Sequence, residues 1–521
     1  MKGPFISNQY QSGHSAAGVV TWPFYLSLSL FLLVCAGYYA TPLWDSDFWW
    51  HIASGREIMQ NGIPSVDPFG VFSATDAVRN DTVLKGQWLG QVLLFGLYDM
   101  GGVNAVIGFR VLVLLICLGW VVWRSRLLEV EPLVLWPVLA VVAVMLPHFG
   151  GERPQLLSFL FAVTFFAVLD RVERSHAESR HQRWLWALPL ITVLWANSHG
   201  GVLLGVALLG LWSGLKLLDA RCPRQEKIRW GVATIVVMLA SLATPNGLQT
   251  YLYLFNLEGS VLQSRTSEYV SAFQLYTLGH VWPQLWVIVY YLLATAAAVM
   301  LVRQRRWIPV AILVFLGAIS ISSFRYFMFF LIIASPYVAM GLQGWVAGRV
   351  SLRPRVQSLG HAVLALLLVG LLLTGVLRGN MFRGGFLEQA YPVAMADFVA
   401  AQHLQGRSFN NMEWGGYLLW RLSPQVKMYI DGRMLDQTRF PPYTNILWAT
   451  PQGVQAFERE NFQLVMMPYH GRYDPQRYPL IDYLRTRPEW QLLYRDAKGV
   501  VFARQEKRQE KRQEKLEERN Q

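Results

Sequence analysis

Long apolar blocks, separated by short polar stretches, make up most of the chain between residues 22 and 377. Many of the blocks are about 20 residues long, the length of helix that crosses roughly 30 Å of hydrocarbon. We therefore expect about eleven membrane-spanning helices. They are predicted near residues 22–40, 103–123, 132–147, 155–170, 184–197, 201–218, 230–244, 281–302, 307–321, 326–345 and 357–377. Residues 84–100 are apolar but short and interrupted, which favours a helix lying at the external interface.

Basic residues fall in alternate loops between the predicted spans. One set of loops carries two to four arginines or lysines each, whereas each intervening short loop carries at most one. An excess of positive charge marks the cytoplasmic loops of membrane proteins. The alternation therefore places an N-terminal segment, residues 1–21, in the cytoplasm and the residues after 378 on the outer, periplasmic side.

Composition supports a membrane protein rather than a nucleic-acid-binding protein. Of the 521 residues 53% are hydrophobic and only 15% are charged, well below the roughly 25% of a soluble domain. Most of the net charge of +13 lies in short interhelical loops, where topology explains it. None of the three cysteines, Cys35, Cys117 and Cys222, falls in a predicted external domain, so we expect no structural disulfide.

Three polar pieces are predicted outside the membrane, namely the loops 41–102 and 245–280 and residues 378–503. The last has the composition of a soluble domain and mixes strand-like with helical patterns. Strands are predicted at RSFNN, VKMYIDG, FQLVMMPY, WQLLYRD and GVVFARQ, and helices at AYPVAMADFVAAQ and PLIDYLRTR. The predicted fold class is an all-α polytopic membrane bundle, residues 22–377, with a small α/β external C-terminal domain. The charged repeat at 504–521 is expected to be disordered.

The first external loop opens with a group of acidic and aromatic side chains. Asp45 and Asp47 directly follow the first predicted span and precede Trp49, Trp50 and His51. Acidic residues at a membrane face are costly unless they are solvated, paired or functional. One aspartate could accept a proton from an acceptor hydroxyl or hold a divalent cation, with the aromatic rings stacked on a sugar. The alternative is that both aspartates are solvated and cap a helix.

Single arginines stand at two nearly apolar external turns. Arg153 follows Glu152 between the third and fourth spans, and Arg325 lies between the ninth and tenth. A guanidinium at such a place suits a phosphate, which it can grip with two parallel hydrogen bonds. The alternative is an internal ion pair between Arg153 and either Glu152 or Asp47.

The remaining polar candidates have simpler interpretations. His51, His148 and His199 lie on the predicted external face, but they lack the spacing of a zinc motif. Asp67 is expected to shape a turn, as is the Asp-Gly pair at Asp431. In the external domain, packing is favoured over a saccharide groove for the two aromatic side chains Trp414 and Tyr417.

Several motifs together resemble a bacterial group of GT-C-type membrane proteins, polyprenyl-phosphate-sugar-dependent and mannosyltransferase-like. The segment DSDFWWHIASGREIMQNGIPSVDPFG, followed by QWLGQVLLFGLY, is similar to the first external loop of that group. Later landmarks are ERPQLLSFLF, WANSHGGVLLG and TPNGLQTYLY, while NNMEWGGYLLWRL with YIDGRM resembles the external C-terminal domain. The resemblance covers most of the chain, in order.

The resemblance implies a glycosyltransferase of the bacterial inner membrane that takes a sugar from a polyprenyl-(di)phosphate donor. Asp47 or Asp45 would be the general base, with Asp47 slightly favoured, and Arg153 and Arg325 would neutralise the donor phosphate. Further candidate substrate contacts are Glu152, His51, His199, Trp49 and Trp50. A divalent cation, Mg²⁺ or Mn²⁺ on the two aspartates, is implied only for diphosphate donors. The acceptor, a glycan, lipid or protein, stays open.

Other functions for a membrane protein of this kind make different demands on the sequence. A flippase or transporter of lipid-linked sugars would need ionisable residues within spans and broken helices in paired repeats, and the sequence shows few of the former and no convincing repeat. An O-antigen ligase or polymerase would need a large later loop rich in arginine and histidine, but the 245–280 loop holds only Arg265 and His280. A non-catalytic assembly protein with the same fold is a further alternative.

Overall fold

The computed structural model describes residues 22–72, 77–148, 150–174, 183–255, 271, 284–346, 354–470 and 477–505. These form two compact units. Unit 1 comprises Met1–Leu43 and Gly86–Phe386, and unit 2 comprises Trp44–Lys85 and Leu387–Gln521. The predictions for residues 1–21, for most of the 245–280 loop and for the tail beyond residue 505 lie outside the described residues.

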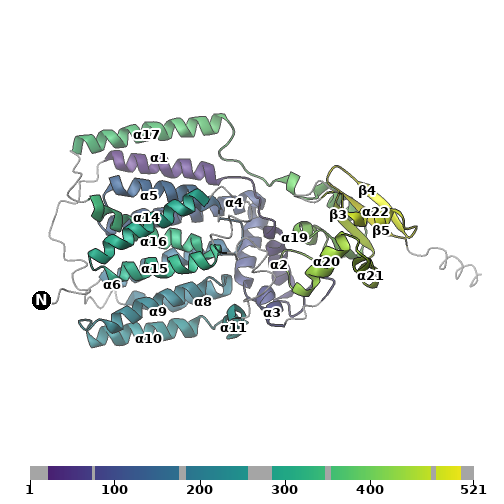
Figure 1. Ribbon diagram of the computed structural model, residues 1–521, viewed down its shortest axis with the longest axis horizontal. Coiled ribbons are helices and arrows are strands. Elements are labelled where there is room, and N and C mark those ends of the chain that lie inside the picture. Colours follow the sequence, from purple (N-terminus) through teal and green to yellow (C-terminus); the bar gives the residue numbers. More distant parts are fainter. Residues whose placement is uncertain are drawn as a thin grey trace, which may run out of the picture. The chain divides into compact units, whose positions relative to one another are not determined.

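Unit 1 is a bundle of helices that lie side by side (Figure 1). Its helices are α1 Trp22–Tyr39, α4 Trp88–Leu127, α5 Pro132–Met145, α6 Gln155–Arg174, α8 Ala187–Ser198, α9 Val202–Leu218, α10 Arg224–Ala240, α11 Gln249–Phe255, α14 Gln284–Arg303, α15 Trp307–Ser322, α16 Phe327–Val346 and α17 Pro354–Leu377. Short 3₁₀ turns, η1 Leu146–His148, η2 Arg183–Trp186 and η3 Phe324–Tyr326, precede or follow some of them. Each of the eleven predicted apolar segments overlaps one of these helices.

The length and composition of the described helices support an integral membrane protein. Six of them are long and apolar enough to cross a bilayer, and they are Trp22–Tyr39, Trp88–Leu127, Gln155–Glu173, Leu285–Arg303, Phe324–Val346 and Arg355–Leu377. Three shorter apolar helices are Pro132–His148, Val202–Leu218 and Trp307–Ser322. The predicted helical membrane bundle is thus confirmed, whereas the number of eleven spans stays a prediction.

Helix α4 joins two helical segments across a sharp bend. Its backbone leaves helical geometry at Gly101 (φ −158°, ψ 23°) and Gly102 (φ 62°, ψ −155°), a conformation that glycine adopts without a steric penalty. The segment before the bend, residues 88–100, is called here the arm of α4. The prediction of a helix separate from the span at 103–123 is therefore confirmed, and its place at the membrane interface stays a prediction.

Helix α16 forms the centre of the bundle and packs against α4, α5, α6, α14 and α15. Every residue from Phe327 to Ala339 is buried. Helix α14 approaches closely at Gly341, where a Cβ atom would lie 2.6 Å from the Ala297 carbonyl oxygen. Small residues allow such close contact between membrane helices, where van der Waals packing and hydrogen bonds drive association.

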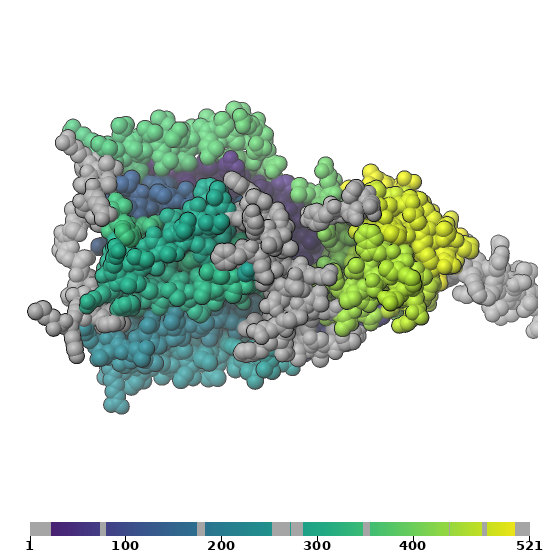
Figure 2. Space-filling model, viewed as in Figure 1, coloured from purple at the N-terminus to yellow at the C-terminus, as the bar shows by residue number. Residues whose placement is uncertain are grey.

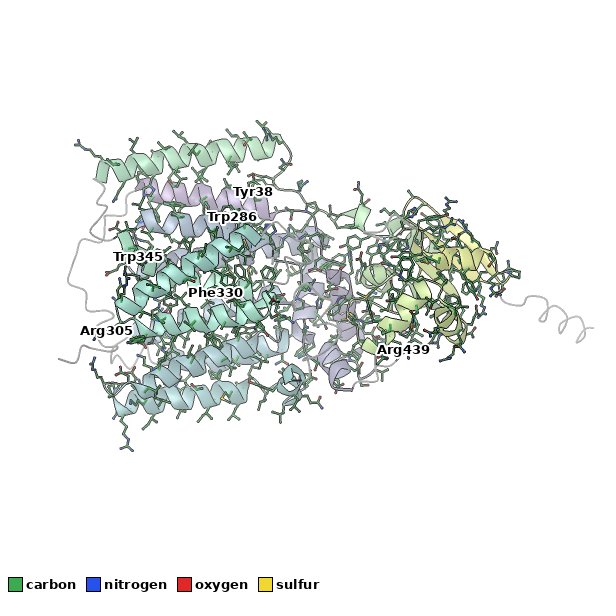
Figure 3. All side chains as sticks on the ribbon, in the orientation of Figure 1. Tyr38, Trp286, Arg305, Phe330, Trp345 and Arg439 are labelled. Carbon is green, nitrogen blue, oxygen red and sulfur yellow. The ribbon has the colours of Figure 1, made fainter. Side chains whose placement is uncertain are left out.

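Side chains labelled in Figure 3 lie toward the two ends of the bundle. Trp345 and Arg305 lie toward one end, and Tyr38 and Trp286 lie toward the other (Figure 3). Tryptophan and tyrosine favour the two membrane interfaces, so these rings suit the borders of a hydrocarbon layer. The outward leucines of α17, such as Leu366 and Leu377, are among the exposed apolar residues. Helix α17 forms an edge of unit 1 in the space-filling view (Figure 2), where lipid would cover such side chains.

Ion pairs are buried between the helices of unit 1. Arg124 Nε contacts Asp170 Oδ2 at 2.7 Å, and the two side chains are 2% and 1% exposed. Lys216 likewise pairs with Glu173. An opposite charge offsets the high cost of a charged group away from water. Neither pair was predicted from the sequence, because the two partners lie on different helices.

Unit 2 contains a five-stranded sheet with helices around it (Figure 1). Its elements are α2 Asp47–Asn61, α3 Ala77–Lys85, α18 Val393–Ala401, β1 Gly406–Asn410, α19 Met412–Leu422, β2 Val426–Met428, α20 Phe440–Leu447, α21 Pro451–Arg459, β3 Leu464–Pro468, α22 Pro479–Arg485, β4 Trp490–Arg495 and β5 Gly499–Arg504. The strand order is β2-β1-β3-β5-β4. Strand β1 is parallel to β2 and β3, and β5 is antiparallel to β3 and β4. The carboxyl ends of β1 to β4 therefore share one edge.

The predicted α/β character of this unit is confirmed. All five predicted strands and the helices α18 and α22 form as expected. Three further helices, α19, α20 and α21, were not predicted. Helix α19 contains the pair Gly415 and Gly416, which lowers the helix propensity, but the Asn411 side chain accepts a hydrogen bond from the Trp414 amide at 3.2 Å and caps it.

Residues 44–85 of the first external loop belong to unit 2, whereas the sequence analysis grouped the whole loop 41–102 with the membrane bundle. The Val71 amide donates to the Met428 carbonyl at 2.9 Å, and the Met428 amide donates to the Phe69 carbonyl at 3.0 Å. Beside this bridge the guanidinium of Arg433 holds two carboxylates. It contacts Asp67 at 2.7 and 3.1 Å and Asp431 at 2.8 and 2.7 Å.

The ion pairs of Arg433 with Asp67 and Asp431 connect the first external loop to the sheet. Arg433 is 3% exposed, and although burial lowers the pKa of its guanidinium, the carboxylates of Asp431 and Asp67 raise it overall. The Asp67 side chain also accepts the Phe69 amide at 3.2 Å, so it shapes the predicted turn. Its ion-pair partner Arg433 is distant in the sequence and could not be predicted.

We expect Arg433→Met to destabilise unit 2 by about 3–5 kcal/mol, because two carboxylates would stay buried without their cation. Arg439 (Figure 3) is the matched control, since its side chain is 26% exposed where it pairs with Asp436 and Glu460. Arg439→Met should cost about 1 kcal/mol. Thermal unfolding and limited proteolysis of the detergent-purified chain measure both variants, and equal losses would contradict the prediction.

Candidate functional site

Three turns at the ends of unit 1 helices carry the candidate basic residues. Arg153 lies just before α6, which begins at Gln155, and His199 lies between the end of α8 and the start of α9. Arg325 is the middle residue of η3, directly before α16. We call Arg153, His199 and Arg325 the basic cluster, because electrostatic interactions connect both arginines to the histidine.

The ring of His199 is held by hydrogen bonds on one side. The Gly201 amide donates to Nδ1 at 3.0 Å, so Nδ1 must be an acceptor. The Ser158 hydroxyl lies 2.8 Å from the same nitrogen and accepts the indole N–H of Trp195 at 2.7 Å. A Cβ on Gly201 would lie 2.6 Å from the Ser158 oxygen, so glycine permits this approach. The proton of the neutral ring is therefore on Nε2.

Electrostatics also favour the neutral ring. Burial lowers the pKa of His199, and the positive charges of Arg325 and Arg153 lower it further, to about 3. A neutral His199 adds no charge of its own to the positive potential of the two guanidiniums. Such a potential beside an apolar bundle suits an anion, and guanidinium geometry matches both carboxylates and phosphates.

Glu152 has an ion-pair partner that the sequence analysis missed. The structure pairs its buried carboxylate with Arg110 of α4. Arg110 also donates to the carbonyl oxygens of Tyr39 and Thr41, both at 2.7 Å. A lone arginine within an apolar span was the available signal. Glu152 thus pairs with Arg110, and an ion pair of Arg153 with Glu152 or Asp47 stays a prediction.

The arm of α4 packs onto the turns that carry the cluster. A Cβ on Gly90 would lie 2.6 Å from the Ser198 carbonyl oxygen and 2.8 Å from Pro154 Cβ, so the missing side chain lets the arm reach both turns. The Trp88 indole N–H donates to the Asn197 side-chain oxygen at 2.7 Å. These contacts place the arm against Pro154 and Ser198. Pro154 directly follows Arg153 in the sequence, and Ser198 directly precedes His199.

The acidic motif lies at the start of α2 in unit 2. Asp45 is 3% exposed, and its Oδ1 accepts the amide of Asp47 at 3.0 Å. Asp45 thus accepts the amide of the first residue of α2, and it is buried, unlike the solvated capping residue of the sequence alternative. Asp47 is the first residue of the helix and is partly buried. The two carboxylates therefore have different surroundings.

Asp47 contacts the Asp-Gly turn that follows β2. Its Oδ1 lies so close to Gly432 that a Cβ there would collide with it, and Trp50 Nε1 lies 3.6 Å from the same position. On the other side a Cβ on Gly416 would lie 2.9 Å from the Ser46 carbonyl oxygen. Helix α2 therefore docks at the carboxyl edge of β1 and β2, the edge at which open α/β sheets commonly bind ligands.

The aromatic residues of the motif are used in packing within unit 2. Trp49, 2% exposed, meets Tyr391 and Tyr417 edge-on at 5.5 and 5.0 Å between ring centres. The His51 ring lies 3.5 Å from that of Trp50. Tyr417 is buried as well, in agreement with the packing role expected for it. Substrate contacts of Trp49, Trp50 and His51 stay predictions.

The predicted site residues thus fall into two groups, each described within its own unit. Unit 1 brings together Arg153, His199 and Arg325, and unit 2 holds Asp45 and Asp47 with the aromatic residues. No set of three or more His, Cys, Asp or Glu side chains in the described part of the chain is placed to hold a metal ion.

The apolar helices, together with the small α/β unit, define a polytopic membrane protein. Solved structures share this fold. ArnT from Cupriavidus metallidurans bound to undecaprenyl phosphate matches with a TM-score of 0.52 and 16% identity over 94% of this chain and 98% of its own. Its apo state matches with a TM-score of 0.51 and 17% identity over 92% and 97%.

A third similar structure is the Archaeoglobus fulgidus oligosaccharyltransferase in complex with Zn and sulfate. Its TM-score is 0.55 at 10% identity, over 92% of this chain and 73% of the oligosaccharyltransferase. No protein-family model and no curated protein sequence matches the chain. At these identities the likeness concerns the fold alone. The chain shares the fold of these membrane proteins, in agreement with the GT-C-type fold that the sequence motifs implied.

The lowered pKa of His199 predicts a loss of stability in acid. The unfolded chain, with a histidine pKa of about 6.5, binds the proton more tightly than the folded chain, whose His199 pKa is about 3. The contribution to stability is therefore complete above about pH 6.5 and falls as the pH drops toward 3, by about 2 kcal/mol at pH 5.

His199→Gln should remove this dependence, because glutamine does not titrate. The measurement compares the thermal unfolding midpoints of the wild type and the variant at pH 7.5 and pH 5. His403→Gln, in unit 2, is the control substitution. An equal acid sensitivity of wild type and His199→Gln would show that His199 does not stay neutral when folded.

Proposed function

We propose that the chain is a glycosyltransferase that moves a sugar from a polyprenyl-phosphate donor to an acceptor at the periplasmic face of the bacterial inner membrane. The observation that carries the proposal is the basic cluster, in which two arginines act on a buried neutral histidine at the ends of apolar helices. A fold by itself does not define an activity, so the proposal depends on this site.

The physical demands of a lipid-linked donor fit this cluster. The polyprenyl chain can stay in hydrocarbon while its phosphate reaches the turns of the bundle. When the bond to the sugar breaks, the leaving polyprenyl phosphate gains negative charge, which Arg153 and Arg325 would stabilise. That ArnT binds undecaprenyl phosphate on the same fold supports this choice of donor.

A monophosphate donor needs no metal ion at the site. A diphosphate donor would call for a divalent cation such as Mg²⁺ or Mn²⁺ on Asp45 and Asp47. Asp45 already accepts the Asp47 amide, which leaves it less suited to a cation than a solvated carboxylate.

We infer that Asp47 is the general base. Asp45 accepts the Asp47 amide and is 3% exposed, whereas Asp47 is partly exposed at the carboxyl edge of the sheet. In the proposed step the Asp47 carboxylate takes the proton of the acceptor hydroxyl. The hydroxyl oxygen attacks the anomeric carbon, and the bond between that carbon and the phosphate oxygen breaks with inversion.

Asp47→Asn should reduce sugar transfer by about 10²- to 10⁴-fold, because the amide cannot accept the proton. Asp45→Asn should retain more activity, since its amide oxygen can still accept the Asp47 backbone N–H. Both are tested in a gene-deletion strain complemented with each variant, with mass spectrometry of the surface glycans and glycolipids. Full activity of Asp47→Asn at wild-type protein level would exclude Asp47 as the base.

Arg153→Ala and Arg325→Ala should each weaken donor binding by about 10- to 100-fold, the value of a charge-assisted hydrogen bond. Arg305→Ala is the matched control, because Arg305 is an exposed arginine before α15, while Arg325 follows that helix. Binding of citronellyl phosphate, a short polyprenyl phosphate, to the purified chain measures the effect. Equal affinity in all three variants would contradict a phosphate site at the cluster.

A further inference from the structure

Two buried amide side chains in unit 1 lack hydrogen-bond partners. Gln91 is 1% exposed and Asn246 is 6% exposed. Among the described residues, neither the nitrogen nor the oxygen of either amide has a partner. Each amide offers two donors and one acceptor oxygen, and burying such groups unsatisfied is destabilising. Polar side chains kept at this cost are candidates for ligand contacts.

Gln91 lies on the face of the α4 arm that packs into the bundle. The buried residues of the arm are Gly90, Gln91 and Leu94, so the Gln91 side chain is turned away from solvent. Its neighbour Gly90 packs on Pro154 and on the Ser198 carbonyl. Pro154 directly follows Arg153 and Ser198 directly precedes His199 in the chain, so Gln91 is the chain neighbour of a residue that packs on the turns of the basic cluster.

Asn246 lies in the turn that follows α10. Hydrogen bonds connect this turn to the end of α8 and to the arm of α4. The side-chain nitrogen of Asn197 donates to the Ala243 carbonyl at 2.8 Å, while its oxygen accepts the Trp88 indole N–H at 2.7 Å. Asn197 therefore joins the arm, the end of α8 and the turn after α10. Gln91 and Asn246, the two amides without hydrogen-bond partners among the described residues, therefore lie on elements that meet beside His199.

We propose that Gln91 and Asn246 recognise the hydroxyl groups of the donor sugar next to the phosphate held by the basic cluster. The inference rests on the proposed function and adds the substrate class, a neutral sugar. A hydroxyl both donates and accepts a hydrogen bond, and an amide offers both partners. A cationic sugar would call for a carboxylate, but the nearby Glu152 is paired with Arg110.

The proposal predicts opposite effects of Gln91→Leu on stability and on binding. Leucine has a similar size and no polar atoms, so the ligand-free protein should unfold at a higher temperature, by on the order of 2 °C. The same change removes hydrogen bonds to the sugar and should weaken its binding about 3- to 10-fold. A residue with a purely structural role would not combine these two effects.

The test measures thermal unfolding of the detergent-purified full chain with two kinds of probe. One is citronellyl phosphate, and the other is a set of citronellyl phosphates that carry glucose, mannose or arabinose. Ligand binding raises the unfolding midpoint according to affinity. We expect at least one sugar-bearing probe to raise the wild-type midpoint more than bare citronellyl phosphate does. Gln91→Leu, Gln91→Met and Asn246→Ala should lose this additional rise.

Controls separate the donor sugar from other sources of hydroxyl groups. Free glucose, mannose and arabinose should not raise the midpoint, because they lack the phosphate that the cluster binds. Gln343→Leu is the matched substitution, since the Gln343 amide is hydrogen-bonded to the Glu131 amide at 2.6 Å and the Glu129 carbonyl at 3.0 Å. It should not raise the ligand-free midpoint, and it should keep the sugar-dependent rise.

The outcomes distinguish this inference from the proposed function. If Gln91→Leu keeps the wild-type response to every sugar-bearing probe, the inference is overturned while the phosphate site stands. The same holds if no sugar adds to the effect of bare citronellyl phosphate on the wild type. If citronellyl phosphate and all its sugar derivatives leave the wild-type midpoint unchanged, the proposed function itself fails.

Discussion

The free-energy cost of burying a charged side chain away from water determines how this chain arranges its ionisable residues. Arg110 with Glu152 and Arg124 with Asp170 meet this cost as ion pairs between helices, and Arg433 meets it in unit 2 with two carboxylates. At the basic cluster, burial and the charges of Arg325 and Arg153 keep His199 neutral. In the proposed function, these two arginines hold an anionic headgroup at the turns of the bundle.

The two units contribute different chemistry to the proposed reaction. Unit 1 supplies apolar helices for a lipid and a basic cluster for its phosphate. Unit 2 supplies the acidic motif, and holds α2 against the carboxyl edge of its sheet through the glycine contacts at Gly416 and Gly432 and the carboxylates around Arg433. The first external loop therefore belongs with the C-terminal residues, although more than 300 positions separate Asp67 from Arg433.

Stability and ligand recognition make opposite demands on the polar groups around the cluster. Ser158, Trp195 and Gly201 satisfy one side of His199, which orders the turn before any ligand arrives. Gln91 and Asn246 stay unsatisfied among the described residues, so a hydroxyl-bearing ligand would satisfy them only on binding. Preorganised donors and acceptors of this kind lower the ordering cost that binding must meet.

Hydropathy determined the helical membrane bundle, because the length of an apolar segment is a local property of the chain. Local patterns also predicted the five strands of unit 2 and the turn at Asp67. The helix α19 was missed because its cap at Asn411 had to outweigh two glycines. Only the tertiary structure decided the strand order, the partner of Glu152, the assignment of residues 44–85 to unit 2 and the meeting of Arg153 and Arg325 at His199. Each of these depends on contacts between residues distant in sequence, and such contacts leave no periodic pattern.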